Sequence, residues 1–572
     1  MSGPSPVERP LGATPESGGT TFRVWAPRAR TAAVELAGAT VPLDAAGRGV
    51  FEGVGPAAAG DDYAVRLDGA APLPDPCSRS QPAGVAGPSR VVDPAAFDWD
   101  EGGWRGLDRD DLVIYELHVG TFTGPGTFAA AAERLPALRA LGVTAVELMP
   151  VATFPGLRNW GYDGLYAWAP HHVYGGPEGL AALVAAAHRE GIGVVLDVVY
   201  NHLGPGEERL AAFGPYSSSG STPWGRTMNF DGPDSGGVRE WAIQNACMWL
   251  RDMRIDGLRL DAVHAIHDEG PRHVLAELTD RARAASRRPP VLIAESDLND
   301  PKVLRPASEG GWGFDAQWSD DLHHAVHAAA TGERGGYYAD FGSVADVAAA
   351  TERRFAYDGR WSPRRRRCHG APAADRPPGQ FVVYAQDHDQ VGNRALGDRL
   401  APPAARLAAM WVLLSPFVPM IFMGEEHGET RPFLYFTDHP DPAIAAAARR
   451  GRRRELAAFG PLPRAMPDPQ DPATMAACVL RPEEGDAEAT ALYRALLRLR
   501  RELPRDEGPV RCDERAGWAG MRRGAAEVVG NFGRGPVRVP VDARELVLAS
   551  GPGAELRPGA LDLPSLTGAV VR

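Results

Sequence analysis

The sequence predicts a multidomain protein built around a closed parallel (β/α)8 TIM barrel, with an N-terminal β-sandwich and a small C-terminal β domain. Three observations support this prediction. The 572 residues are too many for one compact core, so two to four domains are expected. In the middle of the chain, eight short apolar runs alternate with helical patterns, as in a buried parallel sheet. Both ends carry short alternating runs separated by Gly and Pro, which are typical of antiparallel sheets.

The N-terminal domain is predicted over residues 1–100 as an immunoglobulin-like β-sandwich. Its alternating runs are TTFRVWAP, AAVELAG and DDYAVRLDG. The Pro-rich segment at 69–89 that follows is expected to lie along a surface as an irregular linker. The C-terminal β domain is predicted over residues 486–572, where a helical run leads into AEVVGNFG and PVRVPVD.

The barrel is predicted over residues 101–485, with insertions in its loops. Helical patterns at 128–142, 179–191 and 238–252 separate the first of its strands. A doubly wound sheet is less favoured, because no Gly-rich dinucleotide turn follows the first strand. The eight expected strands are LVIYELHVG (112–120), VTAVELMPV (143–151), VVLDVVYNH (194–202), GLRLDAVH (257–264), PVLIAES (290–296), GFDAQWSD (313–320), QFVVYAQDHD (380–389) and PMIFMGEE (419–426).

Composition excludes several classes of function. A net charge of -12 argues against a general nucleic-acid binder. The most apolar window, 408–424, is broken by Pro416 and Pro419 and is expected to be a buried helix that runs into a strand, so no membrane association is predicted. Five scattered cysteines and the absence of a signal-peptide pattern predict a cytoplasmic protein without a metal cluster. The arginine clusters at 362–370 and 449–455 are interpreted as solvated surface.

Polar residues gather where the expected barrel strands end. The carboxyl ends of barrel strands meet at one mouth, where the functional residues of such folds lie. Side chains alternate along a strand, so Leu258 and Leu260 should face the helices while Arg259 and Asp261 face the lumen. Unrelated buried ion pairs are the alternative, but converging carboxylates would repel one another. The strand-end residues are Asp197, Asn201, His202, Arg259, Asp261, His264, Glu295, His388 and Asp389.

Several carboxylates in one cleft suit glycoside hydrolysis, in which one attacks the anomeric carbon and another protonates the leaving oxygen. Arg259 beside Asp261 favours the ionised form that a nucleophile needs. Glu295 follows an apolar strand, where desolvation should keep it protonated. Any single aromatic residue in the segment at 159–176 is more readily a core residue than a ligand, but the cluster flanked by Gly and Asp favours a loop at the mouth that offers aromatic faces for sugar rings. Its aromatic residues include Trp160, Tyr162, Tyr166 and Trp168.

Four motifs in order, DVVYNH, GLRLDAVH, the Glu of AESD and the HD of QDHDQVGN, resemble the four signature regions of the α-amylase family of glycoside hydrolases. The resemblance implies Asp261 as nucleophile, Glu295 as general acid/base and Asp389 as the carboxylate that binds sugar hydroxyls at the cleavage subsite. The residues to which it gives supporting roles are Tyr162, Asp197, His202, Arg259 and His388.

Within that family, ELMPVATFPGLRNWGYDG (147–164), GFDAQWSDDLHHAVHAAATGE (313–333) and DQVGNRALGDRL (389–400) are similar to the trehalose-releasing members. The resemblance implies a retaining hydrolase that cleaves the α-1,4-glucosidic bond next to the trehalose end of malto-oligosyltrehalose. It also implies a functional link to malto-oligosyltrehalose synthase. Trp224 and His264 are expected to bind substrate, with Trp224 favouring trehalose as the leaving group.

Two alternatives stay open: an α-glucan branching or debranching enzyme, and a non-catalytic sugar-binding protein on the same scaffold. The second is disfavoured because all three acidic residues are present. The chain departs from the family's usual pattern at Ser296, where an acidic residue is expected, and at Asp387, where Ser or Asn is more usual. No cofactor and no obligatory metal are expected.

Overall fold

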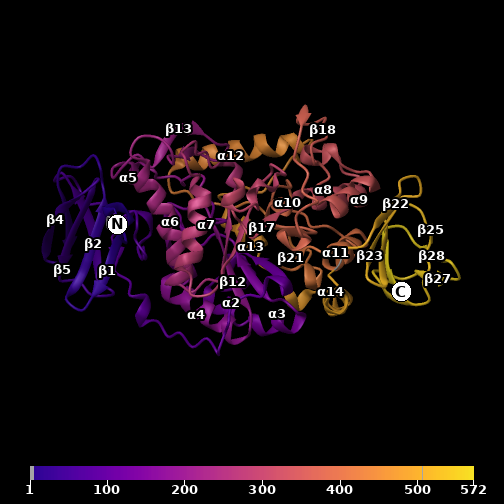
Figure 1. Ribbon diagram of the computed structural model, residues 1–572. Coiled ribbons are helices and arrows are strands. Elements are labelled where there is room, and N and C mark those ends of the chain that lie inside the picture. Colours follow the sequence, from indigo (N-terminus) through magenta and orange to yellow (C-terminus); the bar gives the residue numbers. More distant parts are fainter. Residues whose placement is uncertain (1–4, 506) are drawn as a thin grey trace.

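In the computed structural model, which describes residues 5–505 and 507–572, the eight expected strands close into one parallel barrel (Figure 1). Each strand pairs with its neighbours, and β21 pairs with β8 to close the ring. This confirms the fold class predicted for the centre of the chain. The barrel strands are β8 (Ile114–Leu117), β9 (Ala145–Leu148), β12 (Gly193–Val198), β15 (Gly257–Leu260), β16 (Val291–Ala294), β17 (Ala316–Trp318), β20 (Phe381–Tyr384) and β21 (Val418–Phe422).

The lumen of the barrel is apolar toward the amino ends of the strands and carries charged residue types toward their carboxyl ends. Its apolar part is a separate cluster of side chains contributed by seven of the eight strands. Leu258 and Leu260 belong instead to the large core that the helices cover, so the alternation predicted for β15 is confirmed. Glu116, Glu147 and Asp197 each come two residues after a member of this apolar cluster on the same strand. Their side chains therefore also face the lumen. All three are buried, although they are charged residue types.

Helices surround the barrel, with one difference from the predicted pattern. The run at 128–142 forms two helices, α2 (Phe128–Ala132) and α3 (Leu135–Leu141). Pro136 lacks an N–H, so it fits only the first turn of a helix and a new helix begins there. The patterns at 179–191 and 238–252 are helices α4 (Gly176–Arg189) and α6 (Ser235–Arg251). Among the described residues, no helix is long and apolar enough to cross a membrane.

The N-terminal module has seven strands in the order β1-β2-β5-β4-β3-β6-β7. The long strand β4 pairs with β3 through its first half and with β5 through its second half, so it passes from one layer to the other. Phe22 and Tyr63 join the two layers, with ring centroids 5.1 Å apart. The strands are β1 (Gly12–Glu16), β2 (Gly19–Trp25), β3 (Ala32–Leu36), β4 (Ala39–Gly47), β5 (Val50–Gly55), β6 (Asp62–Leu67) and β7 (Ser89–Arg90).

This module is fixed to the barrel through α6. Gln244 on α6 accepts a hydrogen bond from the Leu11 amide at 2.9 Å and donates to the Val7 carbonyl at 2.9 Å. The segment at 69–89 is mostly irregular, as expected, but much of it is buried, and Trp241 of α6 donates to its Pro76 carbonyl. The module therefore rests on the barrel over a broad contact.

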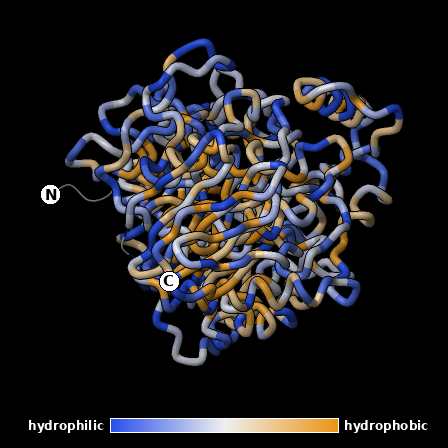
Figure 2. The backbone as a smooth tube through the Cα atoms, turned by 90° about the vertical axis from the view of Figure 1, so that its right-hand side faces the viewer, coloured by the Kyte–Doolittle hydropathy of each residue, from blue (hydrophilic) through white to orange (hydrophobic). Residues whose placement is uncertain are grey.

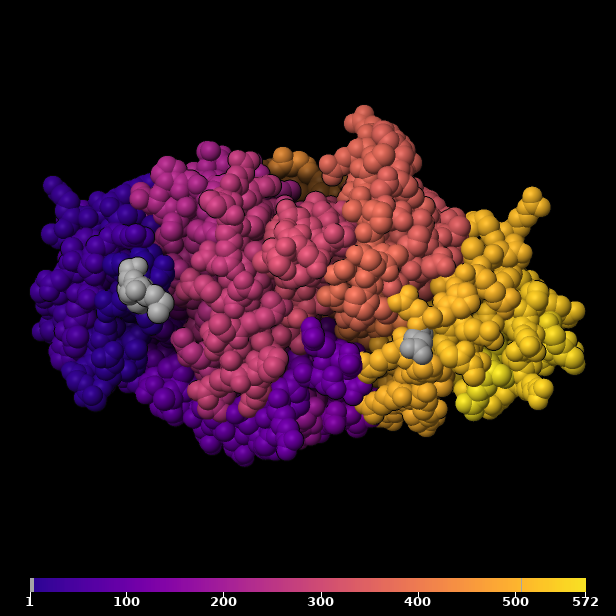
Figure 3. All heavy atoms as spheres, viewed as in Figure 1, coloured from indigo at the N-terminus to yellow at the C-terminus, as the bar shows by residue number. Residues whose placement is uncertain are grey.

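The C-terminal part begins with α14 (Ala487–Glu502), which packs against α11 (Ala404–Leu414) of the barrel. The following strands form a five-stranded and a three-stranded sheet, and the two β domains lie at opposite ends of the molecule (Figures 1 and 3). The strands are β22 (Val510–Asp513), β23 (Trp518–Arg523), β24 (Ala526–Asn531), β29 (Thr567–Val571) and β26 (Leu546–Ala549), then β25 (Val537–Pro540), β28 (Ala560–Leu563) and β27 (Glu555–Arg557).

Apolar residues concentrate in the interior of the molecule and polar residues along its outer turns (Figure 2). We propose domain boundaries after residues 100 and 485. The first boundary falls between the last strand of the N-terminal module and the first barrel strand, and the second lies directly before α14.

Candidate active site

The centre of the barrel mouth is organised around one buried guanidinium, that of Arg259. Its Nη1 lies 2.8 Å from Asp197 Oδ2 and 2.9 Å from Asp261 Oδ1. Its Nη2 lies 3.0 Å from Glu295 Oε2. The Trp318 ring lies 4.3 Å from the guanidinium carbon, and the side chain of Arg259 is fully buried. Three carboxyl groups from three neighbouring strands therefore share one cation.

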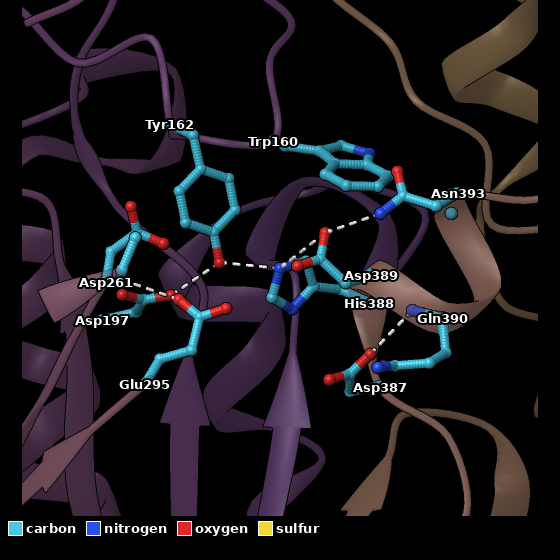
Figure 4. Close-up of polar contacts among 12 residues, drawn as sticks. Trp160, Tyr162, Asp197, Asp261, Glu295, Asp387, His388, Asp389, Gln390 and Asn393 are labelled. Carbon is cyan, nitrogen blue, oxygen red and sulfur yellow. Dashed lines mark hydrogen bonds and ion pairs between the residues drawn. The ribbon is translucent and has the colours of Figure 1, made fainter. Parts of the chain in front are cut away.

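The carboxyl group of Asp261 is held from a second side. Asn201 Nδ2 donates to Asp261 Oδ2 at 2.5 Å and to the Asp261 carbonyl at 2.9 Å. The next residue, Ala262, has a left-handed backbone (φ 40°, ψ 53°). This turn directs the Ala262 N–H at Glu295 Oε2, 2.7 Å away. Asp261 and Glu295 thus open to the same space and are linked through both backbone and cation (Figure 4).

Burial raises the pKa values of two of these carboxyl groups, those of Asp197 and Glu295. Desolvation raises the pKa of Asp197 to about 7, against the opposing pull of Arg259. Desolvation also raises the pKa of Glu295, and the negative charge of Asp261 adds to the effect. The shift of Glu295 is the direction that a proton donor near neutral pH requires, and it agrees with the prediction from the sequence.

A chain of hydrogen bonds runs from Asp197 across the mouth to the first barrel strand. The Tyr162 hydroxyl donates to Asp197 Oδ2 at 2.6 Å and lies 2.9 Å from His388 Nε2. His388 Nδ1 lies 2.5 Å from Glu116 Oε1. Burial alone would lower the pKa of His388, but the carboxylates of Glu116 and Asp389 raise it well above its usual value. The charged ring then donates from both nitrogens, which fixes the direction of every proton in the chain.

Asp389 is more exposed than the other acidic side chains of this centre, Asp197, Asp261 and Glu295. It lies on the short helix α10 (His388–Gly392), and its side chain is 40% exposed. Asn393 Nδ2 donates to Asp389 Oδ1 at 3.3 Å, and His388 Nε2 is 3.6 Å from the same oxygen (Figure 4). Both contacts are long, so the carboxylate keeps the capacity to accept hydrogen bonds from a ligand.

A histidine and tryptophan rim lies beside this centre. Trp224, in the turn between β13 (Ser217–Ser221) and β14 (Arg226–Met228), is 52% exposed. Its ring stacks over His202 with centroids 6.1 Å apart and meets His264 edge-on at 6.4 Å. An exposed aromatic ring on a polar rim is suited to contact with a sugar ring.

Comparison with known proteins agrees with this geometry. Residues 79–217 match the α-amylase catalytic domain, and residues 10–94 match carbohydrate-binding module 48, the isoamylase N-terminal domain. The chain is 48% identical to the malto-oligosyltrehalose trehalohydrolase of Arthrobacter ramosus over 95% of its own length and 97% of that protein. The chain belongs to the malto-oligosyltrehalose trehalohydrolase family. It is a glycosidase of the α-amylase family, as the resemblance in the sequence implied.

Other relatives place the trehalohydrolase family among related α-glucan enzymes. The Saccharolobus solfataricus trehalohydrolase is 44% identical over 85% of both chains. A crystal structure titled as a putative α-amylase from Salmonella typhimurium superposes with a TM-score of 0.89 at 37% identity, covering 98% of this chain and 99% of that one. The 1,4-α-glucan branching enzyme of Corynebacterium jeikeium is 33% identical over 55% of this chain and 50% of its own.

The structure brings the ten predicted site residues to one mouth, but it corrects one expectation about the aromatic segment. Trp160, Tyr166 and Trp168 are buried, and only Tyr162 reaches the polar centre. Trp160 stacks on Phe433 at 5.1 Å, so its faces are occupied by protein. Most of the 159–176 segment thus supports the mouth from behind.

Three polar residues of the site were missed in the sequence. Glu116 and Glu147 face the lumen, as Asp197 does, and strand alternation applied to every strand would have found them. Neither oxygen of Glu147 has a hydrogen-bond partner among the residues that the structure describes, and burial raises the pKa of Glu147 well above the usual value. Asn393 carries no such signal, because it lies in a turn after a short helix.

The two departures from the family pattern have structural positions. Ser296 is buried, and its Oγ accepts from the Leu298 amide at 3.3 Å. Asp387 caps α10 by accepting from the Gln390 amide at 2.8 Å, and burial raises its pKa well above the usual value. Within residues 5–505 and 507–572, no group of three or more His, Cys, Asp or Glu side chains is arranged to hold a metal ion. That catalysis needs no metal stays a prediction.

Proposed function

We propose that this chain hydrolyses the α-1,4-glucosidic bond next to the trehalose end of malto-oligosyltrehalose, releasing trehalose and a shortened malto-oligosaccharide. The observation that carries the proposal is the sharing of one buried guanidinium by Asp261 and Glu295. Family membership supplies the choice of substrate, since the relatives bear the name malto-oligosyltrehalose trehalohydrolase.

In the first step, Asp261 attacks the anomeric carbon as an ionised nucleophile. Arg259 and Asn201 hold its two oxygens, which orients the carboxylate for attack. Glu295, with its raised pKa, gives its proton to the glycosidic oxygen as that bond breaks. Trehalose departs as a neutral alcohol, and a glycosyl ester on Asp261 remains.

In the second step, Glu295 is a carboxylate and takes a proton from the attacking water. The water oxygen bonds to the anomeric carbon, and Asp261 leaves as a carboxylate. Two inversions give net retention of configuration. Asp389 binds hydroxyls of the sugar being cleaved, and the Tyr162 ring stacks on it. His388, whose ring nitrogens face Glu116 and the Tyr162 hydroxyl, supports both residues.

Replacing Asp261 with Asn tests the role of the nucleophile. The side chain keeps its shape but cannot form the ester, so turnover should fall by several orders of magnitude. The fold and ligand binding should be largely retained, because the amide fills the same site. The unfolding midpoint should fall, because the amide nitrogen must face a donor group of either Arg259 or Asn201. Near-normal turnover in this variant would show that Asp261 is not the nucleophile.

The choice of bond is tested by incubating the protein with maltosyltrehalose, maltohexaose and amylopectin. Free trehalose from the first substrate, at a rate well above cleavage of the second, supports the proposal. New α-1,6 branches, or linear chains released from amylopectin, would favour the branching or debranching alternative, to which the Corynebacterium relative gives some weight.

We propose that Trp224 and His264 contact the departing trehalose. Trp224 is the most exposed tryptophan beside the polar centre, and its ring covers His202. A Trp224→Ala variant should lose preference for trehalose-ended chains while still cleaving maltohexaose. An unchanged ratio of the two rates would reject this role.

We further propose a cytoplasmic location and a functional link to malto-oligosyltrehalose synthase. All five cysteines are free thiols, which fits a reducing compartment. The substrate must come from a reaction that converts the reducing end of a malto-oligosaccharide into a trehalose unit.

A further inference from the structure

Helix α12 (Pro442–Leu456) carries five arginines and crosses the top of the barrel (Figure 1). The sequence pattern predicts that all of them are solvated. Four of them are exposed, but the side chain of Arg452 is only 8% exposed. A buried guanidinium needs hydrogen-bond partners, so its contacts identify what it does.

Arg452 binds the turn that follows the catalytic-site helix α10. Its Nη1 donates to Asn393 Oδ1 at 2.7 Å, and its Nη2 donates to the Gly392 carbonyl. Glu455 Oε2, at 2.9 Å, balances its charge. Its two donor groups thus take one side-chain and one backbone oxygen of adjacent residues, which fixes the turn in two directions.

The bond to Asn393 determines which way that amide faces. Arg452 has no acceptor, so the amide oxygen must point at it and the amide nitrogen must point away. The nitrogen then donates to Asp389 Oδ1, 3.3 Å away (Figure 4). With the amide reversed, an oxygen would face the carboxylate, and the contact would become repulsive.

The backbone of the same turn is held from its other side. A Cβ atom on Gly392 would lie 2.0 Å from Trp160, so the indole packs directly against this glycine. The backbone N–H of Asn393 donates to the backbone carbonyl of Asp389 at 2.7 Å. The end of α10 is therefore clamped between Trp160 and Arg452, with Asp389 attached to it.

We infer that Arg452 is a positioning residue for Asp389, acting through the Asn393 amide. The carboxylate is 40% exposed, and its two side-chain contacts are long. Its orientation toward a sugar therefore depends on the Asn393 amide as well as on His388. This inference rests on the sugar-binding role proposed above for Asp389.

The first test compares Arg452→Met with Arg453→Gln, a matched control on the same helix whose side chain is exposed. Loss of orientation at a sugar-binding group is expected to lower kcat/KM for maltosyltrehalose about 10- to 100-fold. Arg453→Gln should stay within twofold of the parent. An Arg452→Met variant that also stays within twofold would overturn the inference.

A double-mutant cycle separates positioning from general support. If Arg452 acts through Asn393, then Arg452→Met combined with Asn393→Ala should lose no more activity than Asn393→Ala alone. Arg452→Lys can still donate one hydrogen bond and should recover part of the loss. An arginine that only stabilises the fold would act independently of Asn393, and the activity losses of the two single variants would then multiply in the double variant. That outcome would contradict the inference.

One further variant, Asp389→Asn, separates a failure of this inference from a failure of the proposed function. Asp389→Asn should be nearly inactive, and if it is not, the proposed function itself is wrong. If Asp389→Asn is inactive while Arg452→Met is normal, only the role of Arg452 fails. Should Arg452→Met not fold, the same cycle is run with Arg452→Lys and Asn393→Ala, and the same rule of non-additive losses decides.

Discussion

Replacing Arg259 with Gln removes the cation that Asp197, Asp261 and Glu295 share. Breaking a buried ion pair costs about 3–5 kcal/mol. Three independent losses would add to roughly 9–15 kcal/mol, enough to unfold most domains. The carboxyl groups can take up protons instead. Asp197 already has a pKa of about 7, so its protonation at or below neutral pH costs little. We therefore expect the free energy of unfolding of the Arg259→Gln variant to be lower than that of the parent by only about 3 kcal/mol at pH 5.

The loss should grow as the pH rises. A carboxyl group whose pKa is raised by folding stabilises the folded state fully below its unfolded pKa and loses that contribution as the pH rises through the folded pKa. Arg259 lowers the folded pKa values of Asp197 and Glu295, so both values rise further without it and this decline continues above pH 7. Each proton retained costs about 1.4 kcal/mol per pH unit. At pH 8 the loss should be at least about 2 kcal/mol larger than at pH 5.

The assay is urea unfolding at pH 5 and pH 8, followed by tryptophan fluorescence. Trp318, whose ring lies 4.3 Å from the guanidinium, is one of the 13 tryptophans that contribute to this signal. Arg453→Gln, on the exposed face of α12, is the control at both pH values. An equal loss at pH 5 and pH 8 would refute the reasoning, because it would mean that the three carboxyl groups do not respond to the missing charge.

Other predictions follow from single contacts. Glu147→Met removes a buried carboxyl without a hydrogen-bond partner and should raise the free energy of unfolding by about 1–3 kcal/mol; a lower unfolding midpoint would contradict this. Gly392→Ala places a Cβ atom 2.0 Å from Trp160 and should cost about 1–3 kcal/mol and lower kcat. The control Gly451→Ala meets nothing within 4 Å and should stabilise α12 by about 1 kcal/mol. Because burial raises the pKa of Glu295, kcat/KM should fall with rising pH only above the ordinary glutamate value of about 4.5; a fall that begins lower would exclude Glu295 as the acid.

The sequence was sufficient for the barrel and for its acidic centre. Strands that are buried on both faces appear as short apolar runs, so all eight could be recognised without tertiary information. Alternation along β15 separates Leu258 and Leu260 from Arg259, and the structure confirms this division. The local sequence pattern predicts this division because the position of a residue along a strand determines which face of the sheet its side chain points to.

The remaining features depend on contacts between distant parts of the chain. Nothing in the run of arginines at 449–455 distinguishes Arg452 from its neighbours, since its partner Asn393 lies 59 residues away. The aromatic segment at 159–176 was expected at the mouth, but Trp160 is covered by Phe433 from a much later loop. Whether such a side chain is buried depends on which distant segment packs against it, and the local sequence does not show this.

The hydrogen bond that the His388 imidazole donates to the Glu116 carboxylate joins residues 272 positions apart. On the ribosome, the first barrel strand is made long before the helix whose histidine it will orient. Until β21 emerges and pairs with β8, the nascent polypeptide has no complete ring of strands that could hold the His388 imidazole against the Glu116 carboxylate. Hydrolytic competence should therefore arise late in biosynthesis, in a single event, when the last strand of the barrel enters its place beside the first.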